Sequence, residues 1–119
     1  MSQWNDSQPI FFQISQRLTE MILRREVEEG AALPSVRQIA ADLSVNPLTV
    51  TRAYQSLVDI GAVEMRRGLG MFVTEGARRK LLAHEREKFL SEEWPRLKAR
   101  LQALELNVAD LMKPEEQKP

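Results

Sequence analysis

The sequence contains no cysteine and a single histidine, His84. The absence of cysteine excludes disulfides, thiolate zinc sites and cysteine nucleophiles, and a lone histidine excludes an all-histidine metal site. Long apolar runs are also absent, because the longest span only a few residues, against the ~20 that cross a bilayer. We therefore expect no metal, no cofactor and no membrane partner.

A net charge is lacking as well. The 17 Lys and Arg residues balance the 17 Asp and Glu residues, so the formal net charge is +0. A neutral chain is not a polybasic coating protein, and a nucleic-acid partner would require locally placed positive charge. Every basic residue before position 75 is an arginine, whose planar fork suits phosphates and guanine edges. Taken alone, this bias fits a compositional accident equally well.

The length and composition favour one domain, or one small domain with a tail. The chain has 119 residues, of which 43% are hydrophobic and 29% charged, so it holds enough apolar side chains for a packed core. The N-terminal segment has no basic stretch before an apolar one. We therefore expect no secretory signal and a cytoplasmic protein.

Apolar spacing predicts two helices near the N-terminus. The first is expected from about Ile10 to Glu28 and to end at Gly30. Ser35 and Gln38 form a capping box, which predicts a second, short helix from about Val36 to Leu43. The apolar face of the first helix consists of Ile14, Leu18, Met21 and Ile22.

The next segment predicts a third helix and a β-hairpin. Asn46-Pro47 supplies an N-cap followed by proline at the first helical position, and Gly61 ends the helix. Strands are expected at residues 62–65 and 71–73, separated by the turn Arg66-Arg67-Gly68-Leu69-Gly70. Two short helices joined by a few residues and followed by a hairpin are typical of a winged helix-turn-helix.

The third helix has the two faces of a recognition helix. Its apolar face is expected to pack on the core and consists of Val50, Ala53, Tyr54 and Leu57. On the other side, the N-terminal residues reach deepest when a helix-turn-helix docks in a groove. Asn46, Thr49, Thr51 and Arg52 are donors suited to phosphates and base edges there, and Leu48 suits a thymine methyl. A solvated helix face is the alternative.

Positive charge is concentrated at the hairpin turn. Arg66 and Arg67 precede Gly68, and glycine lets the backbone approach a phosphate or a narrow minor groove. Arg37 adds a cation near the start of the second helix, where helix N-termini attract phosphate. A generic surface turn is the alternative, although two adjacent arginines beside glycine favour an anionic partner.

Several blocks of residues occur in a recognisable order and spacing: Pro9-Ile10-Phe11-Phe12-Gln13-Ile14, Leu33-Pro34-Ser35-Val36-Arg37-Gln38-Ile39-Ala40, Val45-Asn46-Pro47-Leu48-Thr49-Val50-Thr51-Arg52-Ala53-Tyr54, and Gly61-Ala62-Val63 with Arg67-Gly68-Leu69-Gly70-Met71-Phe72-Val73. Over about residues 9–74 the chain thereby resembles the GntR family of bacterial transcription regulators. Its short tail resembles the YtrA-like branch, which lacks a large effector domain. The resemblance implies a dimeric winged helix, usually a repressor and often controlling a neighbouring transporter operon.

The resemblance also implies roles for individual residues. The matching positions are Arg37, which grips the DNA backbone, Asn46, Thr49 and Thr51 in the third helix, and Arg67-Gly68 at the wing tip. Many members place an arginine where this chain has Thr51 and an acid where it has Arg52, so which of the two makes the main base contact stays open. The predicted DNA-binding residues are Ser35, Arg37, Asn46, Leu48, Thr49, Thr51, Arg52, Arg66, Arg67 and Gly68.

Residues 75–113 are predicted to form a helical dimerisation tail. A first helix is expected over about Gly76–Leu90, a second begins at Ser91 with Pro95 in its first turn, and Asn107 caps a short last helix. A heptad ladder predicts the dimer contacts: Leu90, Trp94, Leu97, Leu101, Leu104, Val108 and Leu111. The alternative is that this stripe folds back on its own domain.

The predicted fold class is mainly α with a small β-hairpin. Residues 9–74 form a winged helix-turn-helix DNA-binding domain, residues 75–113 the dimerisation tail and residues 114–119 a disordered end. Because a lone winged helix covers one half-site, we expect a homodimer on double-stranded DNA with a palindromic site. Its half-sites would lie about one helical turn, roughly 34 Å, apart.

Two other classes of function fit the sequence less well. An enzyme would need a catalytic constellation, but His84 lies in a charged helical stretch and no phosphate-loop or nucleophile-elbow motif occurs. A winged-helix module that binds only protein agrees with the neutral charge, but the arginines and the polar recognition helix argue against it. The sequence names no operator, regulated gene or small-molecule effector. The tail alone is too small for a ligand pocket of the usual ~300 Å³, although a dimer could form one between chains.

Overall fold

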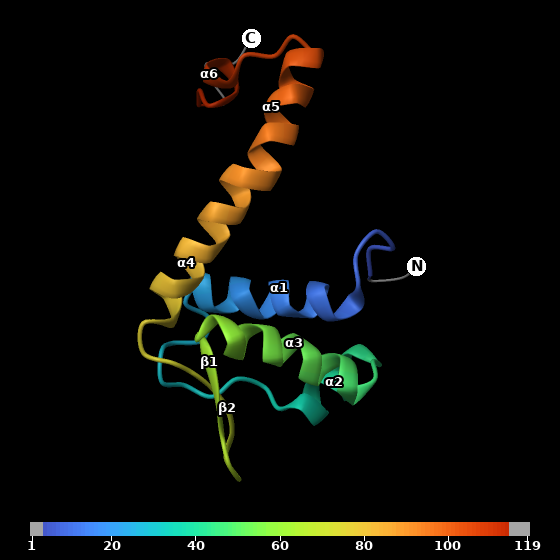
Figure 1. Ribbon diagram of the computed structural model, residues 1–119, viewed down its shortest axis with the longest axis vertical. Helices are drawn as coiled ribbons and strands as arrows, with labels where there is room; N and C mark the ends of the chain where they lie inside the picture. Colours follow the sequence, from blue (N-terminus) through green and yellow to red (C-terminus); the bar gives the residue numbers. More distant parts are fainter. Residues whose placement is uncertain (1–3, 115–119) are drawn as a thin grey trace. The chain divides into compact units, whose positions relative to one another are not determined.

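The structure, a computed structural model, describes residues 4–114 (Figure 1). It divides after Ala83 into two compact units. The first unit contains a helix-turn-helix followed by a hairpin, so the predicted fold class is confirmed. Its elements are α1 (Ile10–Leu23), α2 (Val36–Leu43), α3 (Pro47–Ile60), β1 (Val63–Arg66), β2 (Gly70–Val73) and the beginning of α4 (Ala77–Lys88).

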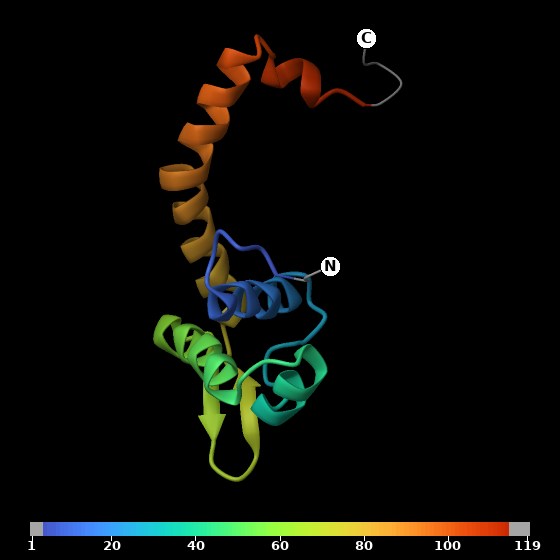
Figure 2. The ribbon, with the colours of Figure 1, turned by 90° about the vertical axis from the view of Figure 1, so that its right-hand side faces the viewer.

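The core of the first unit is made by the apolar faces of its helices. The predicted core face of α3 is buried, with Val50, Ala53 and Tyr54 at 0% exposure and Leu57 at 1%. α1 lies on one side of α3, and the hairpin turn projects on the opposite side of α3 (Figures 1 and 2). The other buried hydrophobic residues of these elements are Ile14, Leu18 and Ile22 in α1, Ile39 and Ala40 in α2, Val63 and Val73 in the hairpin, and Ala77 and Leu81 in α4.

Tyr54 joins α3 to the segment that enters α2. Its ring is buried and its hydroxyl donates a hydrogen bond to the Pro34 carbonyl. Burial raises the pKa of Tyr54 far above its ordinary value, so the hydroxyl stays protonated and remains a donor at any physiological pH. The bond therefore helps to hold α2 in place against α3.

Replacing Tyr54 by Phe is expected to lower the free energy of unfolding by about 1 kcal/mol, because the ring stays packed while the hydrogen bond is lost. Urea unfolding followed by circular dichroism measures the difference. Ser56→Ala is the control, since it removes only a hydrogen bond to Ala53 within α3, and its effect should be smaller. An unchanged urea midpoint for Tyr54→Phe would contradict this role of the hydroxyl.

The hairpin pairs with a segment that sequence patterns did not predict. β1 and β2 are antiparallel with Val63 opposite Val73 and Arg66 opposite Gly70. The loop between α1 and α2 adds a second pairing, in which Ala32 bridges Phe72 and the Leu33 amide donates to the Met71 carbonyl at 2.8 Å. This short pairing ties the wing to the entry of α2.

α1 ends earlier than predicted. It stops at Leu23 rather than near Glu28, because Arg25 adopts a left-handed φ of 62°. The Arg25 amide donates to the Ile22 carbonyl at 3.1 Å and the Glu26 amide to the Met21 carbonyl at 2.8 Å, which is a Schellman ending. The expected stop at Gly30 was wrong, because an arginine occupies the left-handed position that glycine usually takes.

The second unit is helical, and the junction between its first two helices differs from the prediction. After α4 come a π-type turn, η1 (Phe89–Glu93), α5 (Trp94–Ala103) and α6 (Val108–Leu111). Ser91 lies inside η1 and does not begin a helix, so its predicted capping role was wrong. Pro95 has no amide hydrogen and cannot bond the carbonyl four residues earlier. One residue before, the Trp94 amide donates to the Phe89 carbonyl five residues earlier, which is the wider hydrogen-bond pattern of a π-type turn.

The predicted ladder does not lie on one helix. Leu90 belongs to η1, Trp94, Leu97 and Leu101 share α5, Leu104 is the C-cap of α5, and Val108 and Leu111 belong to α6. Glu105 ends α5 with a φ of 55°. Asn107 then caps α6 as predicted, its side chain accepting a bond from the Ala109 amide at 2.8 Å. Within the predicted end at residues 114–119, residues 115–119 lie outside the described residues.

Candidate nucleic-acid interface

The predicted DNA-binding residues lie on α2, α3 and the hairpin, at the surface of the first unit. Thr49 is half-buried, and the others are exposed: Ser35, Arg37, Asn46, Leu48, Thr51, Arg52, Arg66, Arg67 and Gly68. Leu48 is 76% exposed. Their exposure leaves these residues accessible to a partner.

Two of them also build the helices that carry the site. The Ser35 hydroxyl accepts a hydrogen bond from the Gln38 amide at 3.0 Å and so caps α2. The Asn46 side-chain oxygen accepts one from the Leu48 amide at 2.8 Å and caps α3. Capping uses an oxygen acceptor in each case. The Ser35 hydroxyl hydrogen and the Asn46 amide hydrogens therefore remain available to donate to an anion.

An open hollow lies where the beginning of α3 meets the beginning of α1. Its volume is about 350 Å³, and its lining joins three predicted residues to two from α1: Leu48, Thr49 and Arg52 with Ile10 and Phe11. The Arg52 guanidinium carbon lies 3.9 Å from the centre of the Phe11 ring. Sequence reasoning placed Arg52 at the surface but missed this aromatic neighbour.

The two arginines predicted at the wing tip separate in the structure. Arg66 is the last residue of β1, where its guanidinium lies 4.2 Å from the centre of the Phe72 ring and its Nε lies 2.9 Å from Glu64 Oε1. Arg67 begins the turn, which the Leu69 amide closes by donating to the Arg66 carbonyl at 2.8 Å. Both arginines are exposed, but Arg67 is the one that lies in the turn.

Gly68 is required by the geometry of this turn. Its φ is +77°, a left-handed conformation that side chains disfavour, and no atom lies within 4 Å of the position a Cβ would take. Backbone conformation, not lack of space, thus explains the glycine. The open space around it also leaves the backbone of the tip free to approach a partner.

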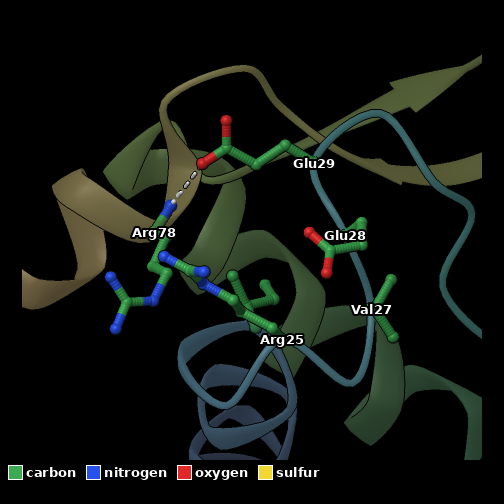
Figure 3. A pocket seen from close by; sticks show the side chains of 6 residues that line it. Arg25, Val27, Glu28, Glu29 and Arg78 are labelled. Atoms are coloured by element: carbon green, nitrogen blue, oxygen red, sulfur yellow. Dashed lines mark hydrogen bonds between the residues drawn. The ribbon is translucent and has the colours of Figure 1, made fainter.

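A group of hydrogen bonds that the sequence analysis did not predict links the end of α1 and the loop after it to the beginning of α4. Figure 3 shows the Glu29 carboxylate directed at the backbone of Arg78. Glu29 accepts hydrogen bonds from the amides of Gly76 at 2.8 Å and Arg78 at 3.2 Å, and Arg78 Nε donates to the Leu23 carbonyl at 3.0 Å. Glu29, in the loop after α1, therefore caps the start of α4, and Arg78 of α4 caps the end of α1. A pocket of about 240 Å³ lies beside them.

These bonds make the cap sensitive to acid. The Gly76 amide, followed by the Arg78 amide, lowers the pKa of Glu29 below its ordinary value. A carboxyl with a lowered folded-state pKa adds stability above its unfolded pKa, and this stability is lost as pH falls through the folded pKa. We expect Glu29→Gln to be less stable than the native protein at pH 7 and the gap to close below about pH 4.3.

Urea unfolding across this pH range measures the gap. Glu28→Gln is the matched control: Glu28 lines the same pocket, but the Gly76 and Arg78 amides donate to Glu29. A gap for Glu29→Gln that persists unchanged at low pH would contradict the cap.

The other chemistry in the described part of the chain is limited. Among residues 4–114, no cluster of histidine, cysteine or acidic side chains could hold a metal ion, and no helix is long and apolar enough to cross a membrane. His84 is exposed, and its Nδ1 lies 3.2 Å from Oε2 of the adjacent Glu85. Its surroundings are those of a surface histidine.

The chain is similar to known regulators over its first unit and to solved structures over most of its length. A family model described as "Bacterial regulatory proteins, gntR family" matches residues 12–73. The HTH-type transcriptional regulator YhcF of Bacillus subtilis is 41% identical over 76 residues, 64% of this chain and 63% of that protein. The HTH-type transcriptional repressor YtrA of the same organism is 40% identical over 76 residues, 64% of this chain and 58% of that protein.

These matches span less than two thirds of either curated relative. A GntR family transcriptional regulator from Listeria monocytogenes extends the likeness to the tail. Its structure matches with a TM-score of 0.74 and 27% identity, covering 92% of this chain and 94% of that one.

Proposed function

Because the chain belongs to the GntR family of bacterial regulatory proteins, we propose that it represses transcription by binding a palindromic site on duplex DNA as a homodimer. α3 enters the major groove, the cations of α2 and the wing contact phosphates, and the tail joins the two copies. The observation that carries this proposal is that the matched region, residues 12–73, is a winged helix whose predicted contact residues face solvent.

Local chemistry supports the DNA contacts. Arg37, Arg52 and Arg67 are exposed and come from α2, α3 and the wing, which are the elements that a winged helix presents to DNA. Near them, Asn46 and Ser35 keep donors free for phosphate. Phosphate contacts position such a protein, while side chains of α3 distinguish bases.

The exposed apolar side chains of the tail support a second copy as partner. Trp94 and Leu101 are half-exposed, and Leu97 is 46% and Leu104 49% exposed. Apolar side chains along a helix that is otherwise charged gain free energy when an identical surface covers them. A C2 dimer would then match the two-fold symmetry of a palindromic site.

A gel shift of promoter fragments at two salt concentrations tests the proposal. Binding should be selective for one fragment and should weaken as salt rises, because phosphate contacts release counterions. A winged-helix module that binds only protein would shift none of the fragments even at low salt, and that result would overturn the proposal.

Because Arg66 and Arg67 have different surroundings, their substitutions should change the salt dependence of DNA binding by different amounts. Arg67→Ala should reduce the slope of log K against log salt by about 0.9, the value for one phosphate contact on duplex DNA. Arg66→Ala is the matched variant and should change the slope less, because Arg66 already contacts Glu64 and Phe72. Equal slopes for native protein and Arg67→Ala would show that the wing tip does not touch DNA.

A further inference from the structure

Two arginines of the first unit stack on phenylalanine rings, and they differ in what their guanidinium edges do. Arg66 lies over Phe72, but its Nε is also bonded to Glu64 Oε1 at 2.9 Å. Arg52 lies over Phe11 at 3.9 Å. Among the described residues, no carboxylate lies within ion-pair distance of Arg52. The two stacks therefore have different consequences for recognition.

Stacking and hydrogen bonding use different parts of a guanidinium group. A cation–π contact uses the flat face, whereas the N–H donors point outward in the plane. Arg52 thus has one face held by Phe11 while its donor edge stays available. Fixing a free arginine side chain costs conformational entropy. An arginine that is already held in place loses less entropy when DNA binds, which favours binding.

Phe11 is itself firmly placed. It is half-buried and packs against the hydrophobic core from the first turn of α1, and α1 packs against α3. The ring and the guanidinium also line the same open hollow with Leu48 and Thr49 at the N-terminal end of α3, the end that reaches base edges in a docked helix-turn-helix.

We propose that Phe11 is a positioning residue for sequence recognition: it holds the Arg52 guanidinium so that its donor edge can bond O6 and N7 of a guanine in the major groove. The bidentate arginine–guanine pair is the commonest specific contact of this kind. The inference rests on the proposed DNA binding and adds a residue outside the helix-turn-helix to the reading of the site. Arg66, in contrast, braces the wing.

Discrimination between bases tests the proposal. A site would first be selected by the native protein from a random duplex library, and affinities would then be measured for that site, for variants with each guanine replaced, and for random duplex. Phe11→Leu should weaken binding to the selected site by about 2- to 30-fold, the range of a cation–π contact. It should also reduce discrimination at one guanine and leave binding to random duplex unchanged.

Matched variants separate positioning from a general loss of stability. Two variants should keep the native discrimination. Phe11→Tyr preserves an aromatic face under Arg52, and Phe72→Leu removes only the ring under Arg66. In an Arg52→Ala background, Phe11→Leu should cause no further loss. Urea unfolding checks each variant, and Phe11→Met, which keeps an unbranched apolar side chain, replaces Phe11→Leu if the latter does not fold.

The outcomes distinguish this inference from the function on which it rests. If the native protein selects a site but Phe11→Leu keeps its discrimination, or weakens selected and random duplex equally, the positioning role is overturned and DNA binding stands. A further loss in the Arg52→Ala background would overturn it too. Failure of the native protein to bind any duplex would instead remove the proposed function.

Discussion

Changing both Leu97 and Leu101 to Lys is expected to give monomers with near-native helix content and lost operator affinity. Both leucines belong to α5, and neither is buried in the chain. Placing charge there costs an isolated chain little, whereas burying an unpaired ammonium in a dimer interface is strongly unfavourable. The substitutions therefore act on association rather than on folding.

The loss of affinity should be large because each copy of the proposed dimer binds half of the site. Once one half-site is bound, linkage makes binding of the second intramolecular, and such coupling commonly strengthens binding by 10²–10⁴. We expect a loss of about 100-fold or more on a palindromic site. Sedimentation velocity gives the mass of the variant, and circular dichroism gives its helix content.

Ala99→Lys is the matched control for this pair. It adds a charge at an exposed position of α5 outside the ladder, so the dimer and its affinity should be retained. A double lysine variant that sediments as the native protein does would show that the ladder is not the interface.

Arg52→Ala is expected to cost about 1–3 kcal/mol on the selected site and little on random duplex, the pattern of a base-reading arginine. Arg52→Lys should lose most of the same discrimination, because lysine keeps the charge but not the planar fork. Binding curves on the two kinds of duplex measure both quantities.

Gln55 provides a control on the same exposed side of α3. Its Nε2 donates to Asp59 Oδ1 at 2.8 Å, so Gln55→Ala should have a smaller effect than Arg52→Ala. An equal loss for Arg52→Ala on selected and random duplex would mean that it contacts only phosphate. A larger and base-specific loss for Thr51→Ala would assign the main base contact to Thr51.

The parts of the fold that local chemistry determines could be predicted from the sequence. Asn46 and Ser35 cap α3 and α2 as expected, and Gly61 ends α3 in a left-handed conformation. The core face of α3 followed from helical spacing and is buried. In these places, the capping residues, the spacing of apolar residues and the terminating glycine all predict the same structure.

The parts that were missed depend on contacts between distant residues or on unusual backbone positions. Arg25 and Glu105 take left-handed conformations without being glycine, so no residue type marked those helix ends. The pairing of Ala32 with Phe72 brings a loop against the hairpin. The bonds from Glu29 to the start of α4 join positions 47 and 49 residues apart. Such contacts have no signature within a short window of sequence.

The candidate interface was predicted by residue type and position, but its internal geometry was not. The exposure of Arg37, Arg52 and Arg67 followed from patterning and agrees with the structure. The stacking of Arg52 on Phe11 and of Arg66 on Phe72 depends on which helix or strand packs nearby. Arg66 and Arg67 are adjacent in sequence but have different surroundings, because Arg66 stacks on Phe72 and Arg67 lies in the turn.

The most direct test of the account is selection of duplex DNA by the native protein from a random library, followed by sequencing. Sequence-specific binding by a two-fold dimer predicts an enriched inverted repeat, with half-site centres about one helical turn, roughly 34 Å, apart. Recovery of no enriched sequence, or of a single half-site without its symmetric copy, would contradict it.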